Sequence, residues 1–225
     1  MSKNNNPDWD EVLSAASRLQ RILPEAILVG GTASAIHAKH RFSHDADHVL
    51  VNLRTYFDDI LALLESVAGW KTARIQRPIL ILGSLDGIET GVRQLIRSEP
   101  LETTTIEFRN ETITLPTEAE ILRIKGMLIL KRNAARDYID FVALAHRMGD
   151  VCIAEALKPF DQLYPQTNGE SALQQLQIQL ANPMPFDLDP EMDLSQYKGL
   201  DSYWHDWKTV LATSIHVSIL ILERV

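Results

Sequence analysis

Apolar residues follow both helical and strand spacing from the start of the chain to Pro116. An amphipathic helix is predicted over 9–22, where Trp9, Val12, Ala16 and Leu19 share one face, and Pro24 follows it. Further helices are expected over 32–39 and 56–67. Strands are expected over 26–29, 45–53, 79–82, 88–96, 103–109 and 111–115, the last four as two hairpins.

After Pro116 the pattern becomes almost entirely helical. Thr117 and Glu120 have the spacing of a capping box and predict the start of a helix that runs to about Arg132. Helices are also expected over 134–147, 151–163, 170–180 and 202–223, with a proline-containing loop over 182–199. The sequence therefore predicts an α+β fold with a sheet domain over 1–116 and a helical domain over 117–225.

Composition is that of a globular protein, with 45% hydrophobic and 23% charged residues in 225. The single cysteine, Cys152, excludes an intrachain disulfide. No apolar run approaches the ~20 residues that span a bilayer, and the polar start has no signal-peptide pattern, so a cytoplasmic protein without a membrane partner is expected. The net charge is -8, and the last third is the acidic part, which argues against nonspecific nucleic-acid binding there.

The first candidate site is the turn Val29-Gly30-Gly31-Thr32 between a predicted strand and a predicted helix. Glycines allow a sharp turn and a close approach of the backbone to a ligand. The free N–H groups of the first helical turn attract anions such as phosphate, and Thr32 adds a hydroxyl donor. The alternative is a plain strand-to-helix turn, since short glycine motifs have many false positives.

The second candidate site is the pair Asp45 and Asp47. On a strand these residues point to the same face, roughly 6.5–7 Å apart. Two such carboxylates repel each other unless a cation lies between them, and Mg²⁺ prefers hard oxygen ligands and bridges carboxylates to substrate phosphates. The alternative is an exposed acidic strand start.

Thirteen residues separate Gly31 from Asp45, which is enough for one helix and a return loop. Gly-Gly followed at this distance by Asp-Ala-Asp resembles the signature of the polymerase-β-like nucleotidyltransferases. Within that superfamily, the stretch from Arg41 to Asp47 resembles the AbiEii/AbiGii toxin family, although His48 stands where that family usually has an apolar residue. The resemblance implies a nucleotidyltransferase-fold mixed sheet with flanking helices. It also implies that Gly30, Gly31 and Thr32 hold the triphosphate and that Asp45 and Asp47 hold metal.

A second block is similar to the same family: Lys125, followed by Arg132 and by Arg136-Asp137-x-x-Asp140. The resemblance implies that Lys125 binds phosphate and that Asp137 positions it or the acceptor. The structural alternative is an ion-pair network on a helix, with Arg136 pairing with Asp140 and with Asp137 joining Lys131 or Arg132.

A third carboxylate completes the metal site in active members of the superfamily. Glu89 and Glu107 are the candidates by strand position, and Glu89 is assigned to the metal set with Asp45 and Asp47. The histidines at 37, 40, 44 and 48 lack a recognised zinc-ligand spacing and are not assigned to a metal.

These features predict an Mg²⁺-dependent nucleotidyltransferase that moves a nucleoside monophosphate from an NTP to a hydroxyl of RNA, with tRNA one option, or of a protein. The resemblance further implies a toxin role and a cognate antitoxin protein. An RNA acceptor is expected to meet Lys39, Arg41 and Lys125. Two alternatives remain open: a degenerate member that binds nucleotide or a partner without catalysis, and a metal-dependent phosphohydrolase.

Overall fold

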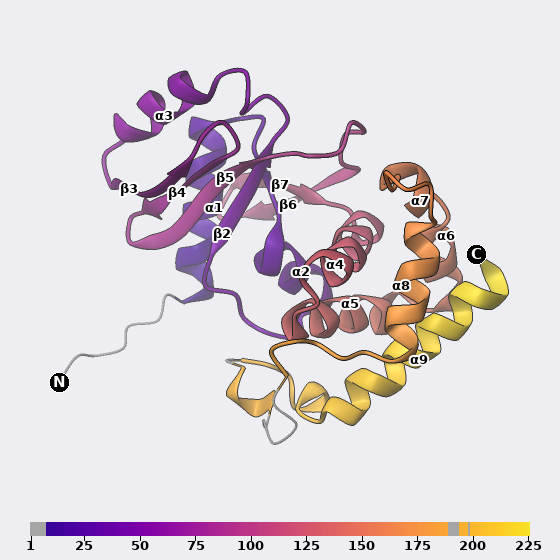
Figure 1. Cartoon of the computed structure of the whole chain (residues 1–225). Coiled ribbons are helices and arrows are strands. Elements are labelled where there is room, and N and C mark those ends of the chain that lie inside the picture. The colour runs from indigo at the N-terminus through magenta and orange to yellow at the C-terminus, as the bar shows by residue number, and fades with distance from the viewer. Residues whose placement is uncertain (1–7, 189–193, 198) are drawn as a thin grey trace. The chain divides into compact units, whose positions relative to one another are not determined.

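The computed structural model describes residues 8–188, 194–197 and 199–225 (Figure 1). By its internal contacts the chain divides into two compact units. The sheet unit contains the described residues up to Ala33 together with Ser43–Pro116. The helical unit contains Ser34–Phe42 together with Thr117–Val225. The short segment Ser34–Phe42 thus belongs to the unit that is formed mainly by the second half of the chain.

The sheet unit is built on a five-stranded mixed sheet in the order β1-β2-β5-β4-β3. Only β2 and β5 are parallel, and the other neighbours are antiparallel. A separate hairpin is formed by β6 and β7. The strands are β1 (Ile27–Leu28), β2 (Ala46–Leu50), β3 (Trp70–Gln76), β4 (Leu80–Leu85), β5 (Ile88–Gln94), β6 (Thr103–Phe108) and β7 (Glu111–Pro116).

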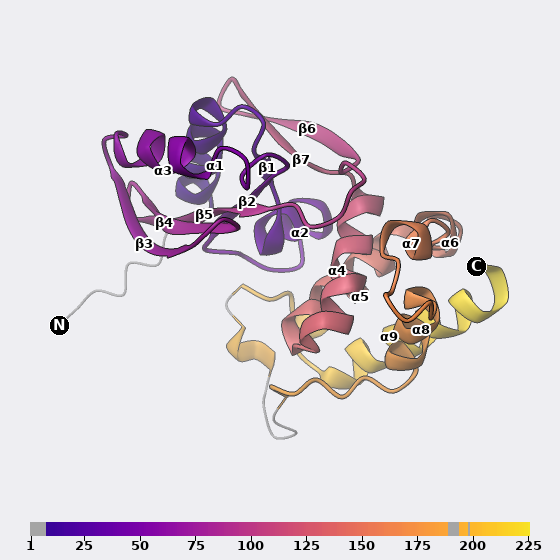
Figure 2. The same cartoon turned by 45° about the horizontal axis from the view of Figure 1, so that its top comes forward.

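Helices α1 (Trp9–Ile22) and α3 (Phe57–Glu65) lie on the same face of the sheet (Figure 2). Asp8 and Glu11 form a full capping box at the start of α1. Leucines and aromatic residues of the two helices meet the inward side chains of the strands in one core cluster, which includes Leu19, Leu64, Phe57, Trp70, Ile81, Leu85 and Val92. The burial of this apolar surface is what fixes which face of each strand is covered.

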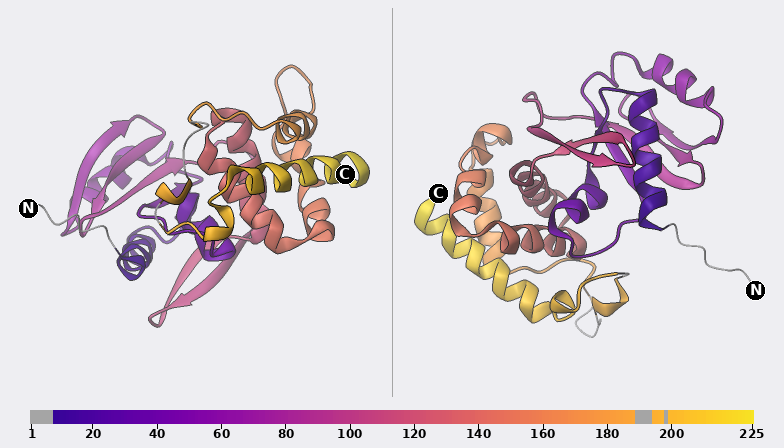
Figure 3. Two further views of the ribbon diagram at one scale, coloured as in Figure 1. Left: turned by 90° about the horizontal axis from the view of Figure 1, so that it is seen from below. Right: turned by 180° about the vertical axis from the view of Figure 1, so that it is seen from behind.

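The hairpin β6–β7 is held to α1 by a glutamine. The side-chain amide of Gln20 donates to the carbonyl of Thr114 at 2.7 Å and accepts from the N–H of Thr114 at 2.8 Å. This side chain therefore satisfies the backbone edge of β7 as a neighbouring strand would. The view from behind shows α1 in front of the sheet with the hairpin beside it (Figure 3, right).

The helical unit is made of α4 (Glu118–Arg132), α5 (Ala135–Met148), α6 (Asp150–Leu157), α7 (Phe160–Leu163), α8 (Ala172–Ala181) and α9 (Trp207–Arg224), with two short 3-10 turns at Leu194–Gln196 and Ser202–Trp204. The Thr117 hydroxyl accepts the N–H of Glu120 at the start of α4. Asn133 ends α4 in the left-handed region, and Gly149, with a positive φ, ends α5. Helices α8 and α9 lie side by side (Figure 3).

The predicted α+β class, with a mixed sheet, flanking helices and a helical C-terminal part, is confirmed. Several details differ. The strand predicted over 45–53 covers only Ala46–Leu50. The helix predicted over 151–163 is interrupted at Pro159, which cannot continue the hydrogen-bond pattern. Strand β3 was not predicted, because after Trp70 it is an edge strand with mostly exposed residues and no apolar face.

Within the part of the chain that the structure describes, no helix combines the length and apolar character needed to cross a membrane.

His48 lies on β2 and is completely buried in the core side of the sheet. Its Nδ1 donates to the carbonyl of Ala46 at 2.8 Å. Burial disfavours the charged ring and lowers the pKa of His48 to about 4, against the opposing effect of backbone hydrogen bonds. The neutral imidazole therefore occupies a position suited to an apolar residue.

The first prediction concerns the pH dependence that His48 adds to stability. In the unfolded chain this histidine takes up a proton near pH 6.5, whereas in the folded protein it does so near pH 4. Between these values the unfolded state binds more protons, so the free energy of unfolding should fall as pH falls through this window, by up to about 3 kcal/mol. His48→Val should remove this component. Urea unfolding at pH 7 and pH 4.5 measures it, and equal pH slopes for both proteins would contradict it.

Candidate functional site

The junction between β1 and α2 (Gly30–Ala38) forms a glycine corner. Gly30 has φ +72°, a conformation that residues with a Cβ rarely adopt, so this turn requires glycine. The helix then begins at once, and the first N–H groups of any α-helix have no acceptor within the helix. With the aligned peptide dipoles, the start of α2 is a region of positive potential.

Asp47 lies directly against this corner. A Cβ placed on Gly30 would be 3.5 Å from Asp47 Cβ and 3.6 Å from its Oδ2. The backbone joins the same two segments, since the N–H of Val29 donates to the carbonyl of Asp47 at 2.8 Å. A half-buried carboxylate of β2 therefore lies beside the glycine from which α2 begins.

Asp45 is the exposed residue just before β2. Its backbone carbonyl accepts a hydrogen bond from the hydroxyl of Thr32, whose side chain is fully buried. The hydrogen of the Thr32 hydroxyl is thus committed to holding the Asp45 backbone. A phosphate at this corner would therefore meet backbone N–H groups of α2 rather than this hydroxyl.

Strand β5 runs parallel to β2, with Thr90 opposite Ala46 and Gly91 opposite Asp47. Because side chains alternate along a strand, Glu89 lies on the same face as Asp47, and it is exposed. Position 91 itself has no room for a side chain, since a Cβ there would be 2.6 Å from Leu82 Cδ2 and 2.7 Å from the carbonyl oxygen of Ile81. On this strand the acid nearest to the Asp45–Asp47 row is therefore Glu89.

Glu107 lies on β6 of the separate hairpin, opposite Thr112. It is not on a strand that neighbours β2. The prediction that Glu107 lies on a strand adjacent to the metal-binding acids was therefore wrong. The strand next to β2 is β5 rather than β6, and local sequence does not indicate which strands pair.

The second predicted block forms a buried ionic cluster in the helical unit. Lys125 of α4 is 3% exposed, and its Nζ lies 2.6 Å from Asp140 Oδ2 and 3.5 Å from Asp137 Oδ1. Arg132 binds both oxygens of Asp137, at 3.0 and 2.8 Å. The Lys125 ammonium thus holds two fully buried carboxylates of α5, and a phosphate-binding role for Lys125 stays a prediction.

Asp140 has further partners that the sequence did not indicate. His40 Nε2 donates to its Oδ1 at 2.7 Å, and Arg41 donates through Nε and Nη2 to both oxygens, at 2.7 and 3.0 Å. Burial alone would raise the pKa of Asp140, but Lys125, Arg41 and His40 hold this pKa well below its usual range. A local pattern favoured Arg136 as its partner, whereas the partners found lie 15 to 100 residues away in sequence.

Comparisons with known proteins give a fold and no family. No protein-family model matches the chain. A protein from H. pylori, whose crystal structure is described as that of a candidate nucleotidyltransferase, superposes with a TM-score of 0.51 at 12% identity over 93% of this chain and 94% of that one. An antigenic nucleotidyltransferase-like protein from Paracoccidioides brasiliensis matches 70% of this chain and 90% of that one, with a TM-score of 0.49 at 19% identity.

The chain has the nucleotidyltransferase fold.

Curated relatives match by sequence over only part of the chain. A stretch of 131 residues, 57% of this chain, is 35% identical to the heme uptake protein MmpL11 of Mycobacterium tuberculosis and 32% identical to the mycolic acid-containing lipids exporter MmpL11 of Mycolicibacterium smegmatis. The match covers 13% of the length of each of these proteins. A segment of the nucleotidyltransferase-fold chain thus has a counterpart within much longer proteins.

The donor set at the glycine corner of this nucleotidyltransferase fold suits a hard divalent cation. Asp45 is exposed and Asp47 is half-buried, so both acidic residues reach the surface of the sheet unit. Among residues 8–188, 194–197 and 199–225, no three histidine, cysteine or acidic side chains gather closely enough to enclose a metal ion. Mg²⁺ commonly binds through one or two carboxylates, water and substrate phosphates, so two acids meet its requirement.

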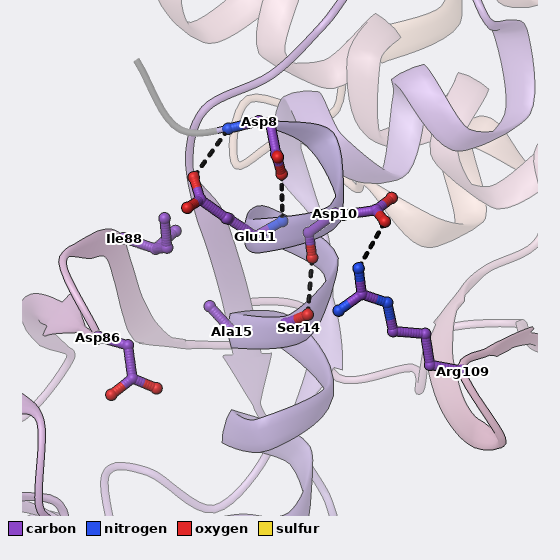
Figure 4. Close-up of a pocket in the computed structure, with 8 residues that line it drawn as sticks. All are labelled: Asp8, Asp10, Glu11, Ser14, Ala15, Asp86, Ile88 and Arg109. Carbon is purple, nitrogen blue, oxygen red and sulfur yellow. Dashed lines mark hydrogen bonds and ion pairs between the residues drawn. The ribbon is translucent and has the colours of Figure 1, made fainter. Parts of the chain in front are cut away.

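A surface pocket of about 240 Å³ lies elsewhere on the sheet unit (Figure 4). Its acids already have partners: Asp8 and Glu11 cap α1, Asp10 accepts from Arg109 at 2.6 Å, and Asp86 accepts from Arg18. Because these charges are satisfied within the protein, the glycine corner remains the stronger candidate for the functional site.

The second prediction tests the link between Thr32 and Asp45. Thr32→Val keeps the shape of the side chain but removes the hydroxyl, so the free energy of unfolding should fall by about 1–2 kcal/mol. Thr32→Ser keeps the hydroxyl and is the matched control. Chemical denaturation of the three proteins measures the difference. A valine variant as stable as the wild type, with the serine variant less stable, would contradict a contribution from this hydrogen bond.

Proposed function

We propose that this protein is a divalent-metal-dependent nucleotidyltransferase that transfers a nucleoside monophosphate from an NTP to an acceptor hydroxyl. The observation that supports this proposal best is the position of Asp47, whose carboxylate lies against Gly30 at the start of α2. A metal-binding acid beside an anion-attracting helix start is the arrangement that a metal-triphosphate substrate needs.

In the proposed reaction, the oxygen of the acceptor hydroxyl attacks the α-phosphorus of the NTP and its proton is released to water. The bond from that phosphorus to the oxygen bridging to the β-phosphate breaks, and pyrophosphate leaves with the electron pair. The first-turn N–H groups of α2 at Gly31 and Thr32 hold the departing phosphates. Asp45 and Asp47 would hold the divalent cation that accompanies the triphosphate. When bound, that cation supplies charge stabilisation and lowers the pKa of the attacking hydroxyl.

The finer assignment depends on the sequence resemblance. The Gly-Gly-Thr turn, the Asp-Ala-Asp motif and the block from Lys125 to Asp140 support an enzyme of the AbiEii/AbiGii toxin type. On this proposal Mg²⁺ is the cation, the acceptor is RNA, including tRNA, or a protein, and a cognate antitoxin protein binds the enzyme.

One observation favours a second candidate, a nucleotide-binding protein of the same fold without transfer activity. Glu89 lies on the correct face of β5, yet no cluster of three acids is formed within the described residues. A protein with only Asp45 and Asp47 could bind a metal-nucleotide complex and lack the third acid of the active members.

The third prediction tests transfer itself. Wild type should label an acceptor when it is incubated with each α-labelled NTP, Mg²⁺ and total RNA, and the label on RNA or on protein identifies the acceptor. Asp47→Asn should lower the rate by about a hundredfold or more, because charge stabilisation by a metal contributes several kcal/mol to the transition state.

Asp59→Asn is the matched control, since Asp59 is an exposed acid of the same unit on α3, and it should transfer at the wild-type rate. Nucleotide binding without labelling by wild type would favour the second candidate. Release of free phosphate or monophosphate without labelling would favour a phosphohydrolase.

The fourth prediction tests Glu89 as the third carboxylate. If Glu89 binds metal in the complex with substrate, Glu89→Gln should lower kcat by about tenfold or more while the affinity for NTP changes little. Glu107→Gln, on the hairpin, is the control and should behave as wild type. Equal rates for the two variants would exclude Glu89 from the metal set.

A further inference from the structure

The segment Lys39–Phe42, here called the connector, follows α2 and belongs to the helical unit. The side chains of its two central residues, His40 and Arg41, both bind the carboxylate of Asp140. His40, 1% exposed, donates to Asp140 Oδ1, and Arg41 binds both oxygens of Asp140. The two-pronged contact of a guanidinium with a carboxylate fixes direction as well as distance.

Lys125 completes this cluster by contacting Asp140 Oδ2 at 2.6 Å. Both oxygens of Asp140 are therefore occupied by donors from α4 and from the connector. A fully buried carboxylate is tolerated only when it is paired and hydrogen-bonded in this way. Loss of its negative charge would leave Lys125 and the Arg41 guanidinium without their shared partner, and the connector would lose its main attachment.

Two further contacts hold the connector from its other side. The N–H of Asp201 donates to the carbonyl of His40 at 2.7 Å. Gly199 lies so close to Phe42 that an added Cβ would be 2.1 Å from the ring carbon Cδ2. The connector is thus held at consecutive residues by Asp140 of α5 and by the segment from Gly199 to Asp201, while Lys39 is exposed to solvent.

The connector occupies a particular place in the chain. It joins the helix that begins at the glycine corner to the motif that begins at Asp45, and only Ser43 and His44 separate it from that acid. Three covalently linked residues cannot move far from a fixed neighbour, because each spans at most about 3.6 Å. Fixing Arg41 therefore restricts where Asp45 can lie.

We propose that Asp140 is a positioning residue for the metal-binding acids: it anchors the connector through His40 and Arg41 and so fixes the chain that presents Asp45 and Asp47. This inference rests on the proposed function for its effect on catalysis. The anchoring itself is a property of the helical unit and is tested without activity.

Asp137 provides the matched control for anchoring. It is as buried as Asp140 and shares Lys125, but it also pairs with Arg132 on α4 rather than with a connector residue. If the cluster only stabilised the packing of α4 and α5, the two asparagine variants would behave alike. If Asp140 anchors the connector, they differ.

The first measurement is limited trypsin digestion, with the cut sites mapped by mass spectrometry. Trypsin cuts after Lys39 and Arg41, and cleavage needs several residues around the site to open locally. Asp140→Asn should speed cleavage in the connector about tenfold or more, and Arg41→Gln should do the same at Lys39, whereas Asp137→Asn should not. Equal connector cleavage in Asp140→Asn and Asp137→Asn would overturn the anchoring.

Arg41→Gln also covers the case in which Asp140→Asn does not fold, because the Arg41 side chain is partly exposed and the substitution leaves Asp140 paired with Lys125. Arg41→Lys keeps the charge and should restore part of the protection, although one ammonium cannot contact both oxygens as Arg41 does. Protection in Arg41→Lys no better than in Arg41→Gln would overturn the role of the Asp140 charge.

The second measurement is the affinity for Mn²⁺, followed by its paramagnetic signal, and then kcat and KM for transfer. Asp140→Asn should weaken Mn²⁺ binding about tenfold, as loss of a supporting contact commonly does, and should lower kcat more than it raises KM. Unchanged Mn²⁺ affinity in a variant whose connector is opened would overturn the positioning role.

Failure of the proposed function gives a different result. In that case wild type shows no transfer, and any Mn²⁺ binding that it shows is unchanged by Asp47→Asn. Protection of the connector from trypsin still depends on Asp140. The two inferences are thus judged by separate readouts.

Discussion

Two hydrogen bonds bring the glycine corner and the acids together, and the candidate site depends on them. The N–H of Val29 binds the carbonyl of Asp47, and the Thr32 hydroxyl binds the carbonyl of Asp45. These bonds join Val29 and Thr32, on either side of the glycines, to Asp47 and Asp45, the two ends of the Asp-Ala-Asp motif. The carboxylate of Asp47 is therefore held beside the start of a helix, where the peptide dipoles favour negative ligands such as phosphates.

The glycines in this arrangement meet two separate physical requirements. Gly30 is needed for its positive φ, because the chain must turn from β1 into α2 within one residue. Gly91, opposite Asp47 on β5, is needed for space, because Leu82 and the backbone of Ile81 occupy the volume of a side chain. The result is an acid with no side chain directly opposite on β5 and with Glu89 farther along the same face.

The helical unit contains buried charged side chains, which cost free energy to bury unless they are paired. Asp137 and Asp140 are fully buried and are neutralised by Lys125, Arg41 and Arg132. A well-packed apolar core of the same volume is often at least as stable as such a cluster, so stability alone does not explain it. The fold comparison identifies a nucleotidyltransferase fold at 12% identity, and at this distance it says nothing about the cluster, whose interpretation rests on its own contacts.

The sequence by itself determined much of the local structure and indicated which residues form the candidate site. The cap of α4 at Thr117, the two predicted hairpins and the glycine corner all depend on hydrogen bonds between near neighbours or on backbone φ, and such features leave local patterns. The spacing from Gly31 to Asp45 likewise indicated the pairing of turn and acids. Only the tertiary structure decided that β5 rather than β6 lies beside β2, that Thr32 uses its hydroxyl internally, and that Asp140 binds His40 and Arg41. Those contacts join residues 13 to 100 positions apart, and they form because burial brings opposite charges or strand edges together, which no short stretch of sequence records.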